Sequence, residues 1–199
     1  MERLFLINAG HGGMVDGRYT TAPDKMYDYG RGIVVYEGVL NRVMKDKVIK
    51  NLKLLGLPYL DVCPSNLDIP LLQRVKSVND YAKWYGVHDC LFIDLHSNAG
   101  GGTGFEIYTS PGETASDEFA TKFIYKFTQT FPEIRTRQDT CDGDPDKESS
   151  FYNLVNTICP AILPEFLFFD NPEDYKKLID PAIQDQYAEM IAEFCLQNK

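Results

Sequence analysis

Three short runs of almost uninterrupted apolar residues constrain the fold of this chain more than any other feature. They occupy Leu4–Asn8, Cys90–Leu95 and Ala161–Phe169. Runs this short and this apolar are typical of strands that are buried on both faces of a sheet. Because such sheets are mostly parallel and carry helices on their faces, the runs predict an α/β protein.

The segments between these runs have the periodicity of amphipathic helices. From Tyr36 to Leu55, apolar residues recur at three- and four-residue spacings, and Gly56 follows as a natural stop. The remaining expected elements are helices at Pro70–Tyr85, Ser116–Phe131 and Pro181–Gln197, a short helix at Phe151–Ile158, a turn and helix start at residues 170–174, a strand at Pro58–Val62 and a more exposed strand at Thr103–Thr109. Strands that alternate with helices over 199 residues, without repeats or low-complexity linkers, predict one α/β domain covering residues 1–199. We expect a twisted, mostly parallel sheet with helices on both faces.

Charge and composition exclude several classes of function. The net charge of −9 argues against a nucleic-acid or anionic-membrane partner, since both bind basic surfaces. No apolar run approaches the ~18–20 residues of a membrane span, and the N-terminal residues lack the pattern of a signal peptide, so synthesis in the cytoplasm is expected. The five cysteines are scattered and form no CxxC pair, so we expect reduced thiols without a disulfide framework or a thiolate zinc site.

Four polar residues stand at places where an α/β sheet binds ligands, which is beyond the carboxyl ends of its strands. His11 follows the first strand within "NAGHGG", and His96 directly follows the strand Cys90–Leu95. Glu165 lies within the last apolar run, and Glu37 opens the long helix. Two histidines and a glutamate are one of the ligand sets of catalytic zinc, which keeps a fourth position for water.

Each of these residues also has a plain structural interpretation. A histidine after a strand is more often a hydrogen-bonded core or loop residue, and Glu37 at a helix start interacts favourably with the helix dipole in any case. Glu165 is harder to explain, because burying a polar group without a partner costs ~2–7 kcal/mol. No HExxH or CxxC motif is present, so spacing alone leaves the metal site open.

Four segments in order, "INAGHGG", "YEGVLNRVM", "LFIDLHSNAGGGTGFEIYTS" and "CPAILPEFLFFDNPED", resemble the motifs of the zinc-dependent N-acetylmuramoyl-L-alanine amidases, the amidase type 3 family. The resemblance implies a phosphorylase/hydrolase-like fold and one zinc ion bound by His11, Glu37 and His96, with Glu165 as the catalytic carboxylate. It also implies hydrolysis of the amide between N-acetylmuramic acid and L-alanine in peptidoglycan. A monomer that acts as a phage or prophage endolysin, or a catalytic domain excised from a secreted protein, is expected.

Some residues depart from the family pattern, and other polar residues are secondary candidates. Ala9 stands where proline is common, and residues 20–32, "TTAPDKMYDYGRG", have no evident counterpart and are expected to form a loop over the cleft. Arg74 and Asn79 are interpreted as structural, and Glu106 is a weaker candidate for the cleft. Whether the acidic loop Gln138–Ser150 contacts substrate is left open.

Two other functions could use similar residues. A zinc carboxypeptidase-like peptidase can share the ligand set and a related fold, but its arginine pattern is not recognisable here. A non-catalytic wall-binding module would typically have lost a ligand or the base, whereas all four residues are present.

Overall fold

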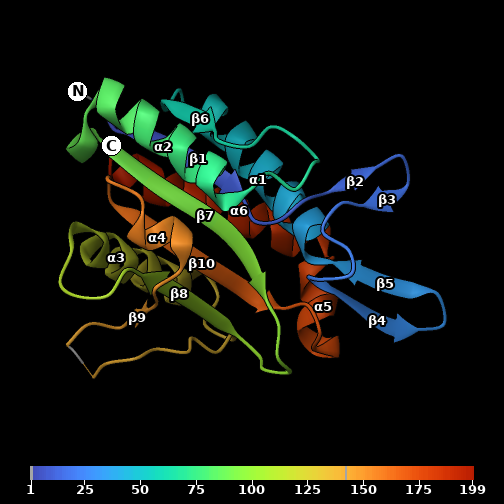
Figure 1. Ribbon diagram of the computed structural model, residues 1–199. Helices are drawn as coiled ribbons and strands as arrows, with labels where there is room; N and C mark the ends of the chain where they lie inside the picture. Colours follow the sequence, from blue (N-terminus) through green and yellow to red (C-terminus); the bar gives the residue numbers. More distant parts are fainter. Residues whose placement is uncertain (1, 142) are drawn as a thin grey trace.

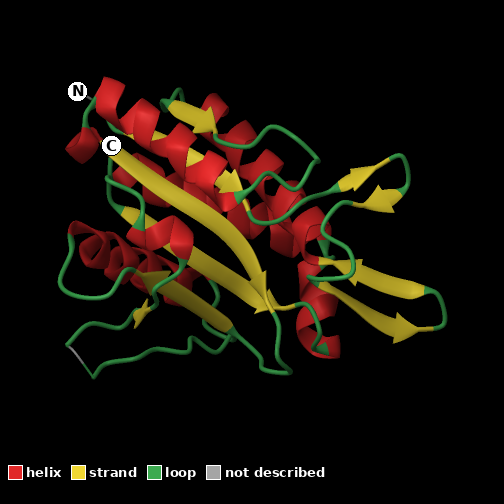
Figure 2. Cartoon of the chain, in the orientation of Figure 1, coloured by secondary structure: helices red, strands yellow, loops and turns green. Residues whose placement is uncertain are grey.

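A six-stranded sheet forms the centre of the computed structural model, which describes residues 2–141 and 143–199 (Figures 1 and 2). In spatial order its strands are β6 (Tyr59–Asp61), β1 (Leu4–Ala9), β7 (Cys90–Asn98), β10 (Ala161–Phe168), β8 (Phe105–Thr109) and β9 (Lys147–Glu148). The first four are parallel to one another, β8 is antiparallel to β10, and β9 is parallel to β8. The predicted mostly parallel α/β sheet is therefore confirmed.

Helices cover both faces of the sheet. On one face lie α1 (Glu37–Leu54), α3 (Ala115–Thr130), α5 (Pro172–Leu178) and α6 (Pro181–Gln197); on the other lie α2 (Leu71–Tyr85) and α4 (Tyr152–Val155), which are in front in Figure 1. A 3-10 turn, η1 (Val87–Asp89), precedes β7. Alternate side chains of each strand enter the two cores, since successive residues of a strand point to opposite faces. In β1, Phe5 and Ile7 enter the core beneath α1 and α6, whereas Leu4 and Leu6 enter the core beneath α2.

Strand β8 differs from the expectation for Thr103–Thr109. It begins at Phe105, and it is buried rather than exposed. Helix α3 covers it: the ring of Phe105 stacks on that of Phe127 with 3.9 Å between centroids, and Phe123 lies beside them. The alternating pattern of this strand does not separate a solvent face from a core face, because its polar residues are buried as well.

Two β-hairpins connect β1 to α1 where a single loop was expected. The first pairs β2 (Met14–Val15) with β3 (Arg18–Tyr19), and the second pairs β4 (Met26–Gly30) with β5 (Ile33–Tyr36). Both project from the edge at which the parallel strands end, on the right in Figure 1. Tyr29 joins the second hairpin to the domain, because its hydroxyl donates to Phe169 O at 3.1 Å and its ring stacks on Tyr175.

None of the helices among the described residues is both long enough and apolar enough to cross a membrane. The four buried cysteines, Cys63, Cys90, Cys159 and Cys195, form no disulfide.

Candidate metal centre

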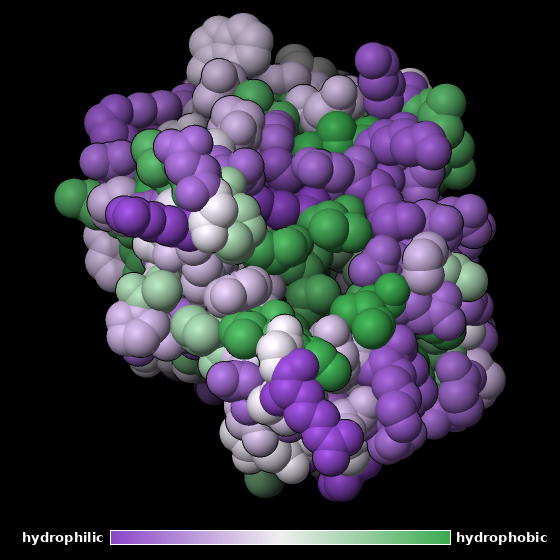
Figure 3. All heavy atoms as spheres, turned by 90° about the vertical axis from the view of Figure 1, so that its right-hand side faces the viewer, coloured by the Kyte–Doolittle hydropathy of each residue, from purple (hydrophilic) through white to green (hydrophobic). Residues whose placement is uncertain are grey.

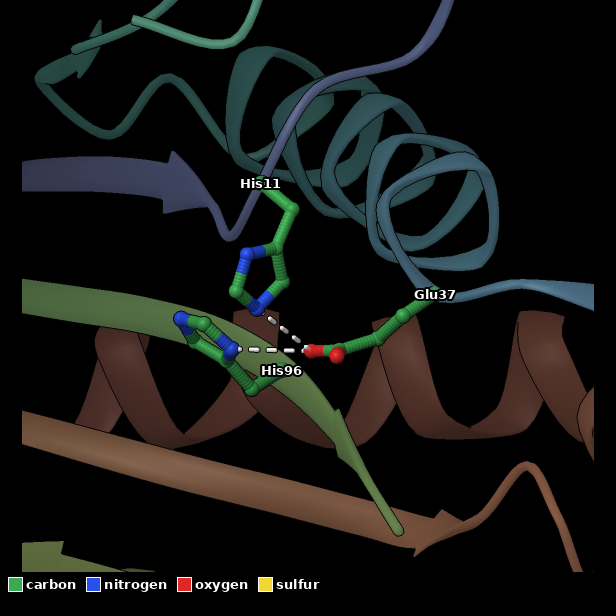
Figure 4. Close-up of side chains that lie close together, drawn as sticks. All are labelled: His11, Glu37 and His96. Carbon is green, nitrogen blue, oxygen red and sulfur yellow. Dashed lines mark hydrogen bonds and ion pairs between the residues drawn. The ribbon is translucent and has the colours of Figure 1, made fainter. Parts of the chain in front are cut away.

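His11, Glu37 and His96 meet at the carboxyl edge of the sheet, as Figure 4 shows. They come from the loop after β1, the first residue of α1 and strand β7. The Oε1 atom of Glu37 lies 3.2 Å from His11 Nε2 and 2.9 Å from His96 Nδ1. One ligand atom from each residue lies within 4.8 Å of the others, so this cluster could hold a metal ion.

The backbone at His11 has an unusual conformation that two arginines hold in place. Its φ of 62° is in the left-handed region, which costs energy for a residue other than glycine. The carbonyl oxygen of His11 accepts hydrogen bonds from Arg42 at 2.8 Å and from Arg74 at 2.7 Å. Arg74, which was expected to be structural, is 2 % exposed and also donates to Ala9 O. The strained turn is therefore fixed by buried contacts.

Two glycines allow the three ligands to come close together. A Cβ atom on Gly10 would lie 2.1 Å from Cε1 of His96, so the imidazole rests directly on the Gly10 backbone. A Cβ atom on Gly38 would lie 1.9 Å from Gly12 O, so the start of α1 touches the loop that carries His11. Larger side chains at either position would separate the ligand-bearing elements.

Glu37 is 2 % exposed, yet its surroundings favour the carboxylate. Burial opposes ionisation, but hydrogen bonding and charge from His11 and His96 outweigh it and hold the pKa of Glu37 below its usual range. Asn41 donates to Oε1 at 3.2 Å, and Lys25 Nζ lies 3.9 Å from Oε2. The residue also stands in the first turn of α1, where a negative charge is favoured. The structural interpretation of Glu37 and the metal interpretation are thus compatible.

Glu165 stands beside the cluster, paired in register with His96 on the neighbouring strand. It lines a cavity of about 180 Å³ together with His11, Lys25, Leu71, His96, Phe151, Tyr152, Asn153 and Leu163. Its Oε2 atom is buried and has no hydrogen-bond partner. Burial, joined by the charge of Glu37 and opposed by His96, raises the pKa of Glu165 to about 8. A carboxyl group in this state is well placed to exchange a proton with a molecule in the cavity.

The cavity lies toward the carboxyl ends of the parallel strands, because His11 follows β1, and His96 and Glu165 stand in the second halves of β7 and β10. In Figure 3, apolar side chains gather around a hollow in a mostly polar surface. Among the cavity residues, Leu71 and Phe151 are half exposed and Leu163 is buried. The site therefore combines a few polar groups with an apolar wall, as ligand sites commonly do.

The other candidates have partners of their own. Glu106 pairs in register with Glu165 but is not among the residues that line the cavity. It is 3 % exposed, and its carboxylate is bound by Arg137, Lys147 and Tyr108. Asn79 links α2 to the segment after α4 by donating to Asn156 O at 2.8 Å.

Sequence reasoning missed two residues beside the cluster. Lys25 lines the cavity but belongs to the segment without a family counterpart, so no motif pointed to it. Asp94 lies beside His96, but in the sequence it only interrupts an apolar run. An isolated charge inside such a run was the available signal for Asp94.

Comparison with known proteins identifies the family to which this chain is similar. The model of the family described as N-acetylmuramoyl-L-alanine amidase matches residues 5–197. The N-acetylmuramoyl-L-alanine amidase CwlM of Bacillus licheniformis is 27% identical over 183 residues, which cover 92% of this chain and 62% of that protein. The endolysin of Bacillus phage SPP1 is 25% identical over 199 residues, covering 97% and 65%. This chain thus spans about three fifths of the length of these relatives.

A solved structure shows the same fold. The catalytic domain of CwlV, an N-acetylmuramoyl-L-alanine amidase from Bacillus (Paenibacillus) polymyxa var. colistinus, superposes with a TM-score of 0.73 at 24% identity. The match covers 99% of each chain.

Proposed function

This chain belongs to the N-acetylmuramoyl-L-alanine amidase family, and from that membership we propose that it hydrolyses peptidoglycan at the amide bond between N-acetylmuramic acid and L-alanine. The observation that carries the proposal is the convergence of His11, Glu37 and His96 at a cavity whose wall also holds Glu165. This arrangement unites a metal-binding cluster with a carboxyl group that can move a proton.

His11, Glu37 and His96 are suited to hold one zinc ion per chain. Ligands of tetrahedral zinc bind at ~2.0–2.2 Å and so lie about 3.4 Å apart, close to the 2.9 and 3.2 Å separations around Glu37 Oε1. His11 Nε2 is buried, and its polar neighbour is Glu37 Oε1 at 3.2 Å, so a cation placed between these two atoms would meet a ligand atom from each residue. A zinc ion bound there would supply Lewis-acid activation of water and of the scissile carbonyl.

Glu165 would act as the general base and then as the general acid. Its unpartnered Oε2 atom can accept a proton from the attacking water and pass it to the departing amine of L-alanine. Burial raises the pKa of Glu165 to about 8, which suits the step that delivers a proton to the amine. The charge of a bound zinc ion would lower this pKa and favour the carboxylate that accepts the proton from water. Leu163 and Phe151 on the cavity wall would restrict water around the reacting bond.

The residues proposed for catalysis all come from one chain, so the proposed active unit is a monomer. The similarity to the endolysin of phage SPP1 supports a role in wall lysis, with synthesis in the cytoplasm before release. The similarity to CwlM supports a catalytic domain of a longer wall enzyme. Both settings require the same reaction.

A zinc peptidase acting on stem peptides is the alternative, and the cavity argues against it. Such enzymes bind the terminal carboxylate of the substrate with arginine, and no arginine is among the described residues that line this cavity. Arg42 and Arg74 lie near the cluster, but backbone carbonyl groups occupy their guanidinium groups.

Mass spectrometry of digested peptidoglycan tests the proposal. Purified wall material incubated with the zinc-loaded protein should release stem peptides that begin with free L-alanine, and the glycan strands should remain intact. A chelator should abolish the release, and added zinc should restore it. Loss of terminal D-alanine without release of stem peptides would show that the protein is a peptidase rather than an amidase. Unchanged wall material would refute both proposed activities.

A further inference from the structure

A buried carboxylate lies directly behind the candidate ligand His96. Asp94 is fully buried and precedes His96 by two residues in β7, so both side chains point to the same face of the sheet. That face is the one covered by α2 and α4, because Cys90 and Phe92 of the same strand belong to its core. Asp94 is outside the cluster of three ligands, and the proposed reaction assigns it no part.

Two amide donors and an imidazole nitrogen surround the carboxylate of Asp94. Asn8 Nδ2 donates to Oδ1 at 2.6 Å, and Asn153 Nδ2 donates to Oδ2 at 2.6 Å. The Nε2 atom of His96 lies 3.5 Å from Oδ1. The amide orientation of Asn8 is settled independently, because Arg74, which can only donate, contacts Asn8 Oδ1 at 3.1 Å. The NH₂ group of Asn8 must therefore face Asp94.

Each ring nitrogen of His96 faces a carboxylate. Nδ1 lies 2.9 Å from Glu37 Oε1 at the centre of the cluster, and Nε2 faces Asp94. A carboxylate only accepts hydrogen bonds, so both nitrogens can donate when no cation is bound. A metal ion held by the cluster would take the place of the proton on Nδ1, and Nε2 would keep its proton toward Asp94.

We propose that Asp94 is a positioning residue that fixes the tautomer and the ring orientation of His96, so that Nδ1 is the metal-binding atom. The inference rests on the proposed role of His96 as a ligand. Contacts of this kind behind a metal-binding histidine commonly strengthen metal binding.

The same contacts connect the ligand to the cavity wall. Asn153 belongs to α4 and lines the cavity, while its amide holds Oδ2 of Asp94. Helix α4 and the imidazole of His96 are therefore joined through one buried carboxylate. A substrate that contacts α4 would meet a wall that is already fixed relative to the metal-binding atom.

Asparagine at position 94 could not accept all the hydrogen bonds that the carboxylate of Asp94 accepts. Its side chain offers one acceptor oxygen, whereas the Asp94 site receives donors from two sides and from His96. In an Asp94→Asn variant, the new NH₂ group would face another donor. His96 would then lose either its partner or its preferred tautomer.

Zinc affinity of Asp94→Asn tests the proposal, with Asp174→Asn as the matched control. Asp174 is also a buried carboxylate, 2 % exposed, but it accepts from Thr103, Gly104 and Phe168, away from the cluster. Chelator competition should show zinc binding weakened ~10–100-fold in Asp94→Asn. Asp174→Asn should lose stability but keep the zinc affinity of the wild-type protein.

The second measurement uses the zinc-loaded wild-type protein and needs no variant. Long-range ¹H–¹⁵N spectra of His96 should show a protonated Nε2 and a metal-bound Nδ1. Zinc bound at Nε2 would overturn the proposal, and so would wild-type zinc affinity in Asp94→Asn. A wild-type protein that bound no zinc would contradict both the proposed metal site and this inference. Wall digestion tests the proposed function by a separate measurement.

Discussion

Gly10 touches the imidazole of His96, so the variant Gly10→Ala, which adds one methyl group, should weaken metal binding. A Cβ atom at residue 10 would lie 2.1 Å from Cε1, 2.4 Å from Nε2 and 2.5 Å from Nδ1 of His96. Gly10 does not have a positive φ, so Gly10→Ala introduces no backbone strain and the effect is steric. The imidazole or the loop must move.

The size of the movement follows from these distances. Ordinary contact begins at 3.4 Å, so the Cβ and Cε1 atoms must separate by about a further 1.3 Å. The loop cannot easily yield, because Gly10 N donates to Leu95 O at 2.9 Å and Asn41 donates to Gly10 O. His96 must therefore leave its position beside Glu37. Overpacking of this kind costs about 1–3 kcal/mol of stability, and a misplacement of about 1 Å at a reacting centre can cost ~100-fold in rate.

The assay combines chelator competition for zinc, thermal melting and wall lysis. Gly102→Ala is the matched control, since its Cβ atom would meet the ring of Phe168 at 2.6 Å without touching the cluster. Both variants should melt at a lower temperature than the wild-type protein. Only Gly10→Ala should bind zinc at least ten-fold more weakly and lyse walls ~100-fold more slowly. Wild-type zinc affinity and lysis in Gly10→Ala would refute the assignment of His96.

Three other outcomes are expected. Elemental analysis should find about one equivalent of zinc in the wild-type protein and in the control His88→Ala, which changes a residue outside the cluster. The His96→Ala variant should lose zinc. Full retention of zinc by His96→Ala would show that His96 is not a ligand. Burial and the neighbouring Asp144 raise the pKa of Asp146 to about 7 from 3.8, although a hydrogen bond from Thr109 opposes them. The folded state therefore binds a proton that the unfolded state has released, and this stabilisation is lost as pH rises through about 7. Urea unfolding between pH 5 and 8 should show a fall in stability that is smaller in Asp146→Asn, and identical slopes would contradict the argument. Thiol titration of the denatured protein should count five, and a preformed disulfide would point to an oxidising compartment.

The main elements could be predicted because their patterns are local. The apolar runs at β1, β7 and β10 end where glycine or a polar residue interrupts them, and α1 shows its apolar face over eighteen residues. The hairpins before α1 could not be predicted in this way, because they depend on contacts distant in sequence. Tyr29 attaches to Phe169, a separation of 140 residues, and no local pattern contains that information.

The candidate site was partly predictable for a related reason. Parallel strands end at the same edge of a sheet, so the positions of His11 and His96 after two such strands already predicted that they meet. The placement of Glu37 depended on the family resemblance, since a glutamate that opens a helix is equally expected without a metal. Lys25 reaches the cavity only because the hairpin folds back, and Asp94 acquires a partner only through the register with Asn8.

Glu165→Gln tests the central claim most directly, because it separates proton transfer from metal binding. Glutamine keeps the volume and one acceptor oxygen of Glu165 but cannot take a proton from water. Wall lysis should fall ~10²–10⁴-fold. Zinc content should stay near one equivalent, and the melting temperature should stay close to that of the wild-type protein, since Glu165 is not proposed as a ligand and glutamine keeps its volume. Loss of zinc from Glu165→Gln would make Glu165 a ligand rather than the base, and substantial remaining lysis would contradict the mechanism.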